Sequence, residues 1–121
     1  MIIGTGVDIT EVRRLKQAVQ KWQDSFLNRI FTDTELKNAK TRGSRYQHLA
    51  GRFAAKEAVF KALGDRNLNW KDVEILNDKE GRPICKIMNG KGKKVNVHIS
   101  ISHVKDYAVA NAIITQEPRC S

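Results

Sequence analysis

The first candidates for chemistry in this sequence lie in one segment, Gly51–Gly64, which contains a single acid, Glu57. At the helical spacing of about 100° per residue, Phe53 and Phe60 fall on the same side as Glu57. A carboxylate on a half-apolar helix face loses hydration unless a cation or hydrogen bonds compensate for it. We therefore expect a positive partner, which is either Lys61 one turn away or a metal ion.

The simpler partner is Lys61, because Glu57 and Lys61 are spaced i, i+4 in the order that favours an ion pair. Such a pair on a wet helix face would contribute only about 0.2–0.5 kcal/mol and have no chemical role. The flanking phenylalanines favour a functional interpretation, because a pair needed only for solubility would lie on the polar face.

Asp8 is a second candidate carboxylate, since it follows an apolar run and precedes a helical pattern. A lone aspartate in this position is more commonly a helix cap. The functional interpretation is a carboxylate held at the end of a strand. With Glu57 it would form an oxygen pair for Mg²⁺, which usually takes one or two carboxylates together with waters and substrate phosphates.

His103 ends an alternating segment, Ser100–His103. A single histidine is more often a structural hydrogen-bonding group, but near basic residues it can bind phosphate or transfer a proton. Neither a dinucleotide-binding glycine fingerprint nor a P-loop is present.

The composition indicates one basic domain, residues 1–121, with a formal net charge of +9. This charge suits an anionic partner, which is a nucleic acid, a phosphorylated metabolite or an acidic protein. The two cysteines, Cys85 and Cys120, are far apart and read as free thiols in a reducing cytoplasm. We expect no signal peptide and no membrane span.

The apolar pattern predicts which elements position these side chains. A strand at 2–8 contains Gly4 and Gly6, whose spacing lets another backbone approach closely. Asp8–Glu11 offers helix-start chemistry for a helix that runs to about Trp22. The other expected elements are helices opened by capping boxes at Thr32–Glu35 and Ser44–Gln47, the second ending at Gly64, and strands at 73–77, 83–88, 95–102 and 107–115.

One strand, then helices, then a run of antiparallel strands is the order of an α+β fold, a long helix packed on a mostly antiparallel sheet. A small-residue face on the long helix is suited to packing on that sheet. The lysines at 91, 93 and 94 read as a solvated turn, with phosphate capture as the less common alternative.

Three segments taken together resemble the phosphopantetheinyl transferases, specifically the short holo-(acyl-carrier-protein) synthase group. They are Gly6–Ile9, Gly51–Gly64 and Ser100–His103, and their order, spacing and the chain length all fit that group. The resemblance therefore spans nearly the whole chain and implies a phosphopantetheinyl transferase-like fold.

The resemblance implies that the phosphopantetheine arm of coenzyme A is transferred to a serine of an apo acyl carrier protein in support of fatty acid biosynthesis, and that adenosine bisphosphate leaves. It implies that Asp8 and Glu57 hold Mg²⁺ against the diphosphate, and that Lys61 contacts phosphate oxygens and assists the leaving group. Glu57, directly or through a metal-bound water, is the expected base for the serine proton.

The resemblance also assigns residues that bind coenzyme A. These are Arg52, Lys56, Lys61, Gly64, Pro83 and His103, of which Arg52 and Lys56 would lie near the phosphates or the subunit boundary. Two places differ from the usual pattern of the group: the Asp65–Trp70 loop is short and lacks a further glycine, and Val104 stands where a hydroxyl or acidic residue is common.

The positive charge of the chain would complement the acidic carrier proteins that the resemblance implies as substrates. We expect Arg13, Arg14 and Lys21, with Lys16, to dock the carrier from the first helix, mainly by accelerating encounter. The resemblance further implies a cytoplasmic homotrimer with active sites at subunit boundaries, and neither nucleic acid nor membrane as a partner.

The main rival interpretation is a small nucleic-acid-binding module, which the +9 charge would support. Aromatic residues make up only 7% of the chain and do not alternate with arginines in a way that suits base stacking. A third interpretation, a purely structural ferredoxin-like subunit, leaves Glu57 among phenylalanines unexplained. The sequence does not choose between Mg²⁺ and Mn²⁺.

Overall fold

The computed structural model describes residues 1–41, 43–64, 67–88 and 95–117. In these ranges one strand is followed by three helices and then by four strands, in the order that the sequence predicts, and the α+β fold class is confirmed. The elements, in chain order, are β1 (Ile2–Glu11), α1 (Val12–Ile30), α2 (Asp33–Lys40), α3 (Arg45–Leu63), a short 3₁₀ turn η1 (Trp70–Asp72), β2 (Val73–Asn77), β3 (Pro83–Ile87), β4 (Val95–His103) and β5 (Tyr107–Gln116).

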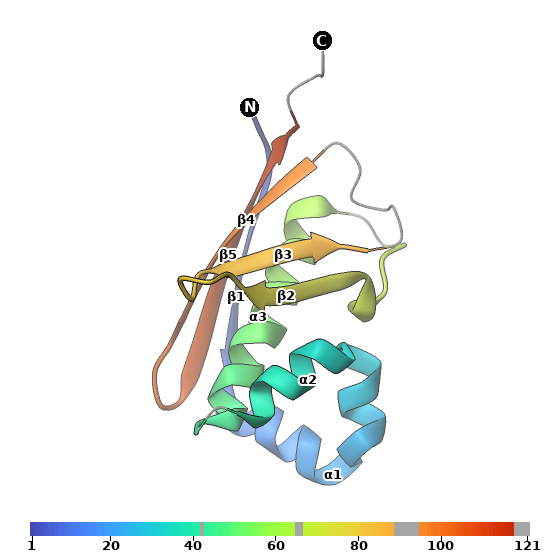
Figure 1. Cartoon of the computed structure of the whole chain (residues 1–121), viewed down its shortest axis with the longest axis vertical. Helices are drawn as coiled ribbons and strands as arrows, with labels where there is room; N and C mark the ends of the chain where they lie inside the picture. The colour runs from blue at the N-terminus through green and yellow to red at the C-terminus, as the bar shows by residue number, and fades with distance from the viewer. Residues whose placement is uncertain (42, 65–66, 89–94, 118–121) are drawn as a thin grey trace.

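The strands form a three-stranded antiparallel sheet in the order β1-β5-β4 and a separate two-stranded hairpin, β2-β3. Helix α3 packs against the three-stranded sheet, as Figure 1 shows, with the hairpin crossing α3 and with α1 and α2 gathered at one end of the molecule. Both apolar clusters of the core draw on α3, so this helix connects all the layers.

Strand β1 and helix α3 approach each other closely because two glycines of β1 carry no side chain. A Cβ atom on Gly4 would lie 2.1 Å from the carbonyl oxygen of Ala62, and one on Gly6 would lie 2.1 Å from that of Ala58. Backbone atoms cannot give way to such a contact without moving the helix. The predicted close approach is confirmed, and α3 is the element that makes it.

Strand β1 is longer than the sequence predicts, and this overturns the expected helix start. Asp8 and Thr10 are not helix-capping residues, because they pair with Ala110 and Ala108 of β5. The N-cap of α1 is Glu11, which makes no side-chain capping bond. Pairing with β5 along the whole of β1 overrides the local capping preference.

Helix α1 also continues past its predicted end at Trp22. Gln23 has φ 48° and ψ −129°, a non-helical conformation that kinks the helix, and a second helical segment then runs to Ile30. Leu27 and Ile30 of this segment are buried in the core. The backbone strain at Gln23 is therefore accompanied by apolar burial that the predicted shorter helix would not provide.

The capping predictions for the other two helices have mixed outcomes. Thr32 and Glu35 form the predicted capping box, with each side chain accepting from the other residue's backbone N–H. Ser44 makes no capping hydrogen bond, so the box predicted at the start of α3 is wrong. Gly64 closes α3 with φ 65°, a left-handed conformation that glycine adopts without steric cost.

A buried ion pair joins α2 to α3. The Lys56 ammonium lies 2.8 Å from Oε1 of Glu35, and both side chains are fully buried. Lys56 also donates to the carbonyl oxygens of Trp70 and Val73, and Oε2 of Glu35 accepts from the backbone N–H of Ile75. Burial lowers the pKa of Lys56, while the adjacent Glu35 carboxylate opposes that shift.

Cys85 is a free thiol, as predicted, and burial raises its pKa to about 12. Cys120 and the lysines at 91, 93 and 94 lie outside the described residues. Within the described part of the chain, none of the helices has the length and apolar character needed to span a membrane.

The buried pair leads to a stability prediction. Lys56→Met should lower the free energy of unfolding by about 3–5 kcal/mol, because it leaves the Glu35 carboxylate buried without its cation. Adding Glu35→Gln should restore part of the loss, since the amide oxygen can still accept a backbone hydrogen bond. Urea unfolding of both variants measures the effect. Lys71→Met removes an exposed lysine and is the control; an equal loss in that control would contradict the role of the pair.

Candidate active site

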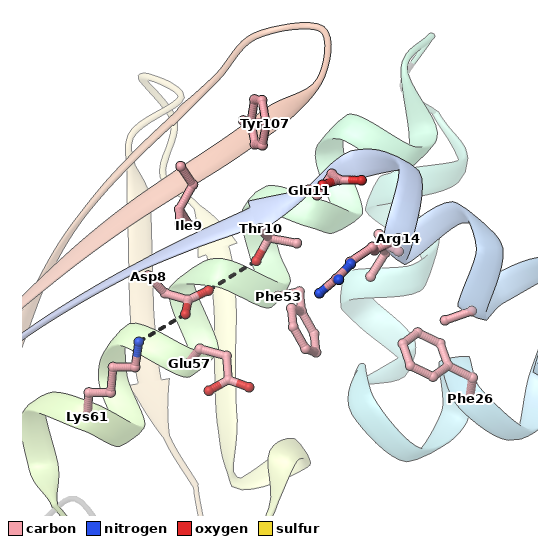
Figure 2. A pocket seen from close by; sticks show the side chains of 12 residues that line it. Asp8, Ile9, Thr10, Glu11, Arg14, Phe26, Phe53, Glu57, Lys61 and Tyr107 are labelled. Carbon is pink, nitrogen blue, oxygen red and sulfur yellow. Dashed lines mark hydrogen bonds and ion pairs between the residues drawn. The ribbon is translucent and has the colours of Figure 1, made fainter.

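A cavity of about 510 Å³ lies between β1, α1 and α3. Figure 2 shows Asp8, Glu57 and Lys61 gathered on one side of it, Arg14 and Phe26 on the other, and Phe53 between them. The three residues predicted to be catalytic therefore share one cavity, although they come from two elements.

Asp8 is held by neighbours from both elements. Thr10 lies two residues further along β1, on the same face of the strand, and its hydroxyl donates to Oδ2 of Asp8 at 3.0 Å. The Lys61 ammonium lies 3.1 Å from Oδ1. The Asp8 carboxylate is thereby fixed in orientation, since each of its two oxygens has a donor.

Lys61 pairs with Asp8 and not with Glu57, its i, i+4 neighbour on the helix. Its ammonium also donates to the carbonyl oxygen of Val7 at 3.0 Å. A simple surface pair along α3 is therefore not what the structure shows; the lysine spans from α3 to β1.

Glu57 lies beside Asp8 without an ion pair of its own among the described residues. Its pKa is raised, first because partial burial disfavours the charged form and second because Asp8 places a like charge nearby; Lys61 opposes these effects. Two carboxylates facing one cavity, one of them with a raised pKa, form a site that gains from a cation.

An aromatic wall supports the helix beside Glu57. The Phe53 ring stacks on Trp70 at 5.2 Å between centroids, and Phe60 meets the edge of the same indole at 5.1 Å. Phe53 lines the cavity, so the apolar surroundings predicted for Glu57 are confirmed. Trp70 itself is held by Lys56, which donates to its carbonyl oxygen.

The donor chemistry of Asp8 and Glu57 fits a hard divalent cation. The described residues contain no group of three or more His, Cys, Asp or Glu side chains placed to hold a metal. A pair of carboxylates with open positions is the arrangement expected for Mg²⁺ that takes its other ligands from water and substrate phosphates. Carboxylate oxygens alone do not distinguish Mg²⁺ from Mn²⁺.

Two predicted coenzyme A ligands lie away from this cavity. Lys56 is fully buried, and its ammonium is bound to Glu35 and two backbone carbonyls, so it does not reach the carboxylate cavity. Arg52 is also buried, and donates to Oδ1 of Asn77 at 2.7 Å. Both face the β2 side of α3 because the helix turns about 100° per residue away from Glu57.

The other predicted ligands are exposed or line a second hollow. Pro83 begins β3 and lines a groove of about 500 Å³ with Arg82, Ser100 and Ile101. His103 ends β4 and is exposed, and Gly64 is exposed at the end of α3. Neither His103 nor Gly64 lines the carboxylate cavity.

The predicted docking residues are exposed along α1. Arg13, Arg14 and Lys21 all face solvent, as does Lys16. Arg14 in addition lines the cavity, so the positive charge of this helix continues to the edge of the carboxylate site.

Thr10 and Trp70 also belong to the site, although the sequence did not predict a role there for either residue. Strand alternation places Thr10 on the same face as Asp8, and this signal was available once residues 2–11 were recognised as one strand. Trp70 gave no such signal, because its contacts with Phe53 and Phe60 arise only when η1 folds back on α3.

Comparison with known proteins places this chain in a family. The sequence profile of the 4'-phosphopantetheinyl transferase superfamily matches residues 4–112. The chain belongs to this superfamily. The phosphopantetheinyl transferase resemblance read from the three segments is thereby confirmed.

The sequence relatives of this superfamily member match it over nearly their whole length. The holo-[acyl-carrier-protein] synthase of Clostridium tetani is 42% identical, over 97% of this chain and 98% of that protein. That of Thermodesulfovibrio yellowstonii is 46% identical, over 95% of this chain and 100% of that protein.

Solved structures of the superfamily share the fold. The holo-(acyl-carrier-protein) synthase of Bacillus anthracis, solved in complex with CoA (3',5'-ADP), superposes with a TM-score of 0.83 at 38% identity, covering 98% of this chain and 99% of that one. The Helicobacter pylori synthase in complex with coenzyme A gives a TM-score of 0.84 at 26% identity, covering 92% and 99%.

The raised pKa of Glu57 leads to a prediction about stability and pH. The charged form of Glu57 destabilises the fold relative to the protonated form. The stability that the protonated form contributes is therefore complete below the ordinary pKa of glutamate and is lost as the pH rises through the raised pKa. Glu57→Gln should therefore raise the melting temperature at pH 8 in the presence of a chelator, and the gain should vanish near about pH 4. Glu117→Gln, at an exposed position, is the control. A lower melting temperature for Glu57→Gln at pH 8 would contradict the assigned environment.

Proposed function

We propose that this chain transfers the 4'-phosphopantetheine group of coenzyme A to a serine of an apo acyl carrier protein, giving the holo carrier protein and adenosine 3',5'-bisphosphate. The observation that carries the proposal is the meeting of Asp8, Glu57 and Lys61 in one cavity of a phosphopantetheinyl transferase chain. The names of the relatives and the coenzyme A complexes of solved neighbours support it.

The reaction forms a bond between the serine oxygen and the β-phosphorus of coenzyme A and breaks the bond to the bridging diphosphate oxygen. Asp8 and Glu57 would hold Mg²⁺, which when bound supplies charge neutralisation at the diphosphate. Glu57, directly or through a water, takes the serine proton. Arg14 is placed to meet negative charge at the opposite wall of the cavity.

Lys61 stabilises the departing adenosine bisphosphate. Its side chain is 53% exposed, so the ammonium can reach phosphate oxygens outside the cavity wall. The leaving phosphate gains negative charge as the bridging bond breaks, and a nearby ammonium lowers the energy of that charge. The step needs positioning and electrostatics and no covalent enzyme intermediate.

Pro83, His103 and Gly64 are proposed to contact coenzyme A on the exposed side of the molecule. The groove beside Pro83 and the exposed His103 both lie along β3 and β4, away from Asp8 within one chain. A homotrimer with active sites at subunit boundaries accounts for this separation, because a neighbouring chain then completes the site.

The outer face of β1 and β5 supports such an assembly. Val7, Ile9, Tyr107 and Val109 are large apolar residues with exposed fractions of 38–67%, on the sheet face opposite α3. Ile9 and Tyr107 also line the carboxylate cavity, so the apolar face reaches the site itself. Sedimentation equilibrium under assay conditions should give the mass of three chains; the mass of one chain would overturn the trimer.

The cell compartment and pathway are part of the same proposal. The free, half-buried thiol of Cys85 is compatible with the cytoplasm, where we propose that the enzyme works with Mg²⁺ in fatty acid biosynthesis. We further propose that residues 1–121 act as one catalytic domain.

A direct assay tests the function. The chain, apo acyl carrier protein, coenzyme A and Mg²⁺ are incubated, and the intact carrier is weighed; we expect a gain of one phosphopantetheine that a chelator prevents. Asp8→Asn and Glu57→Gln should each reduce the rate by at least about a hundredfold. Lys86→Met, on the exposed side of β3, should retain the wild-type rate. No mass gain with the wild-type chain would refute the function.

Carrier docking on α1 gives a separate prediction. Reversing the exposed Lys21 to Glu should raise the KM for the carrier protein severalfold and leave the KM for coenzyme A unchanged, because Lys21 lies outside the cavity. Arg14→Glu should raise both, since Arg14 also lines the cavity. Steady-state kinetics with each substrate varied in turn measures this, and equal effects of Lys21→Glu on both constants would contradict docking.

A further inference from the structure

Lys61 already occupies the carboxylate that the proposed cation needs. Its ammonium lies 3.1 Å from Oδ1 of Asp8, and the Thr10 hydroxyl holds Oδ2. A cation shared by Asp8 and Glu57 must therefore take an oxygen of Asp8 that already has a donor. The two donors differ in kind, because a hydroxyl can rotate its hydrogen away while the lysine carries a full charge.

Of these groups, Lys61 is the one free to move. Its side chain is 53% exposed, whereas that of Asp8 is 16% exposed and lies within the paired part of β1. In the described structure the Lys61 ammonium donates hydrogen bonds only to Oδ1 of Asp8 and to the carbonyl oxygen of Val7. A long, flexible stem lets the ammonium exchange these acceptors for others without moving the helix.

We propose that Lys61 is a built-in counter-ion, which holds Asp8 while the carboxylate pair lacks a divalent cation and moves to the phosphates of coenzyme A when a cation binds. This rests on the proposed function and extends it. One side chain then links two binding events: the cation releases the ammonium, and the phosphates give the released ammonium a new partner.

The charges in the cavity favour such an exchange. Asp8 and Glu57 repel each other, and Lys61 is the cation that offsets them directly. The remaining charged groups that line the cavity are Glu11 and Arg14, and neither forms an ion pair with Asp8 in the described structure. An ammonium left at Asp8 would repel an incoming cation, so cation and ammonium compete for the same oxygen.

The linkage is reciprocal by thermodynamic necessity. If cation binding frees Lys61 for phosphate, coenzyme A binding must draw Lys61 from Asp8 and so improve the site for the cation. Removing the ammonium should therefore strengthen cation binding in the absence of coenzyme A and weaken the coupling in its presence. A lysine that only contacted phosphate would affect coenzyme A binding and leave the cation affinity unchanged.

Calorimetric titration of Mn²⁺ into the metal-free protein tests the first consequence. Lys61→Met keeps most of the length of the side chain and removes its charge, and it should bind Mn²⁺ about three- to tenfold more tightly than the wild type when coenzyme A is absent. Lys86→Met removes the same charge from the exposed side of β3 and controls for net charge; it should bind Mn²⁺ as the wild type does. Circular dichroism confirms that each variant is folded.

The second titration is done with coenzyme A at saturation. Coenzyme A should increase the Mn²⁺ affinity of the wild type by a larger factor than that of Lys61→Met, because only the wild type has an ammonium to transfer. An unchanged or weaker Mn²⁺ affinity of folded Lys61→Met without coenzyme A would overturn the inference.

Asp8→Asn and Glu57→Gln separate this inference from the function on which it rests. Loss of Mn²⁺ binding in both, with no effect of Lys61→Met, would leave the cation site standing and refute only the exchange. Mn²⁺ binding that neither substitution changes would refute the cation site of the proposed function, and the exchange with it.

Discussion

The approach of β1 to α3 without intervening side chains is the constraint on which the site depends. Gly4 and Gly6 lie directly against the backbone carbonyls of Ala62 and Ala58. Any side chain at these positions would push β1 away from α3 and increase the distance between Asp8 on the strand and Glu57 on the helix. The two carboxylates thus lie close together because Gly4 and Gly6 have no Cβ atom.

Other interactions hold the remaining sides of α3. The buried pair of Glu35 and Lys56 joins the helix to α2 and to the start of β2, and the indole of Trp70 closes over Phe53. The same helix therefore has a buried ion pair on one side and the residues that line the carboxylate cavity on another. Adjacent residues, Lys56 and Glu57, serve these different purposes because a helix turns them to different directions.

The outer face of the sheet remains apolar where the inner face is filled by α3. Ile9 shows the consequence, since it is exposed, pairs with Val109 and also borders the carboxylate cavity. A surface of this kind next to a charged site is costly for a lone chain. A partner bound at this face would cover the sheet and also form part of the cavity wall. Assembly would then affect the shape of the site itself.

The sequence by itself determined the element order and the close approach at the glycines, because both follow from local periodicity and residue size. It also singled out Asp8, Glu57 and Lys61, which share one cavity, because they lie in motifs whose residue types are tied to chemistry. It did not determine partners. Lys61 pairs across 53 residues with Asp8 in preference to its helical neighbour. Likewise, only the tertiary structure decided that Lys56 is buried and that Asp8 belongs to a strand, since burial and strand pairing depend on segments distant in the chain.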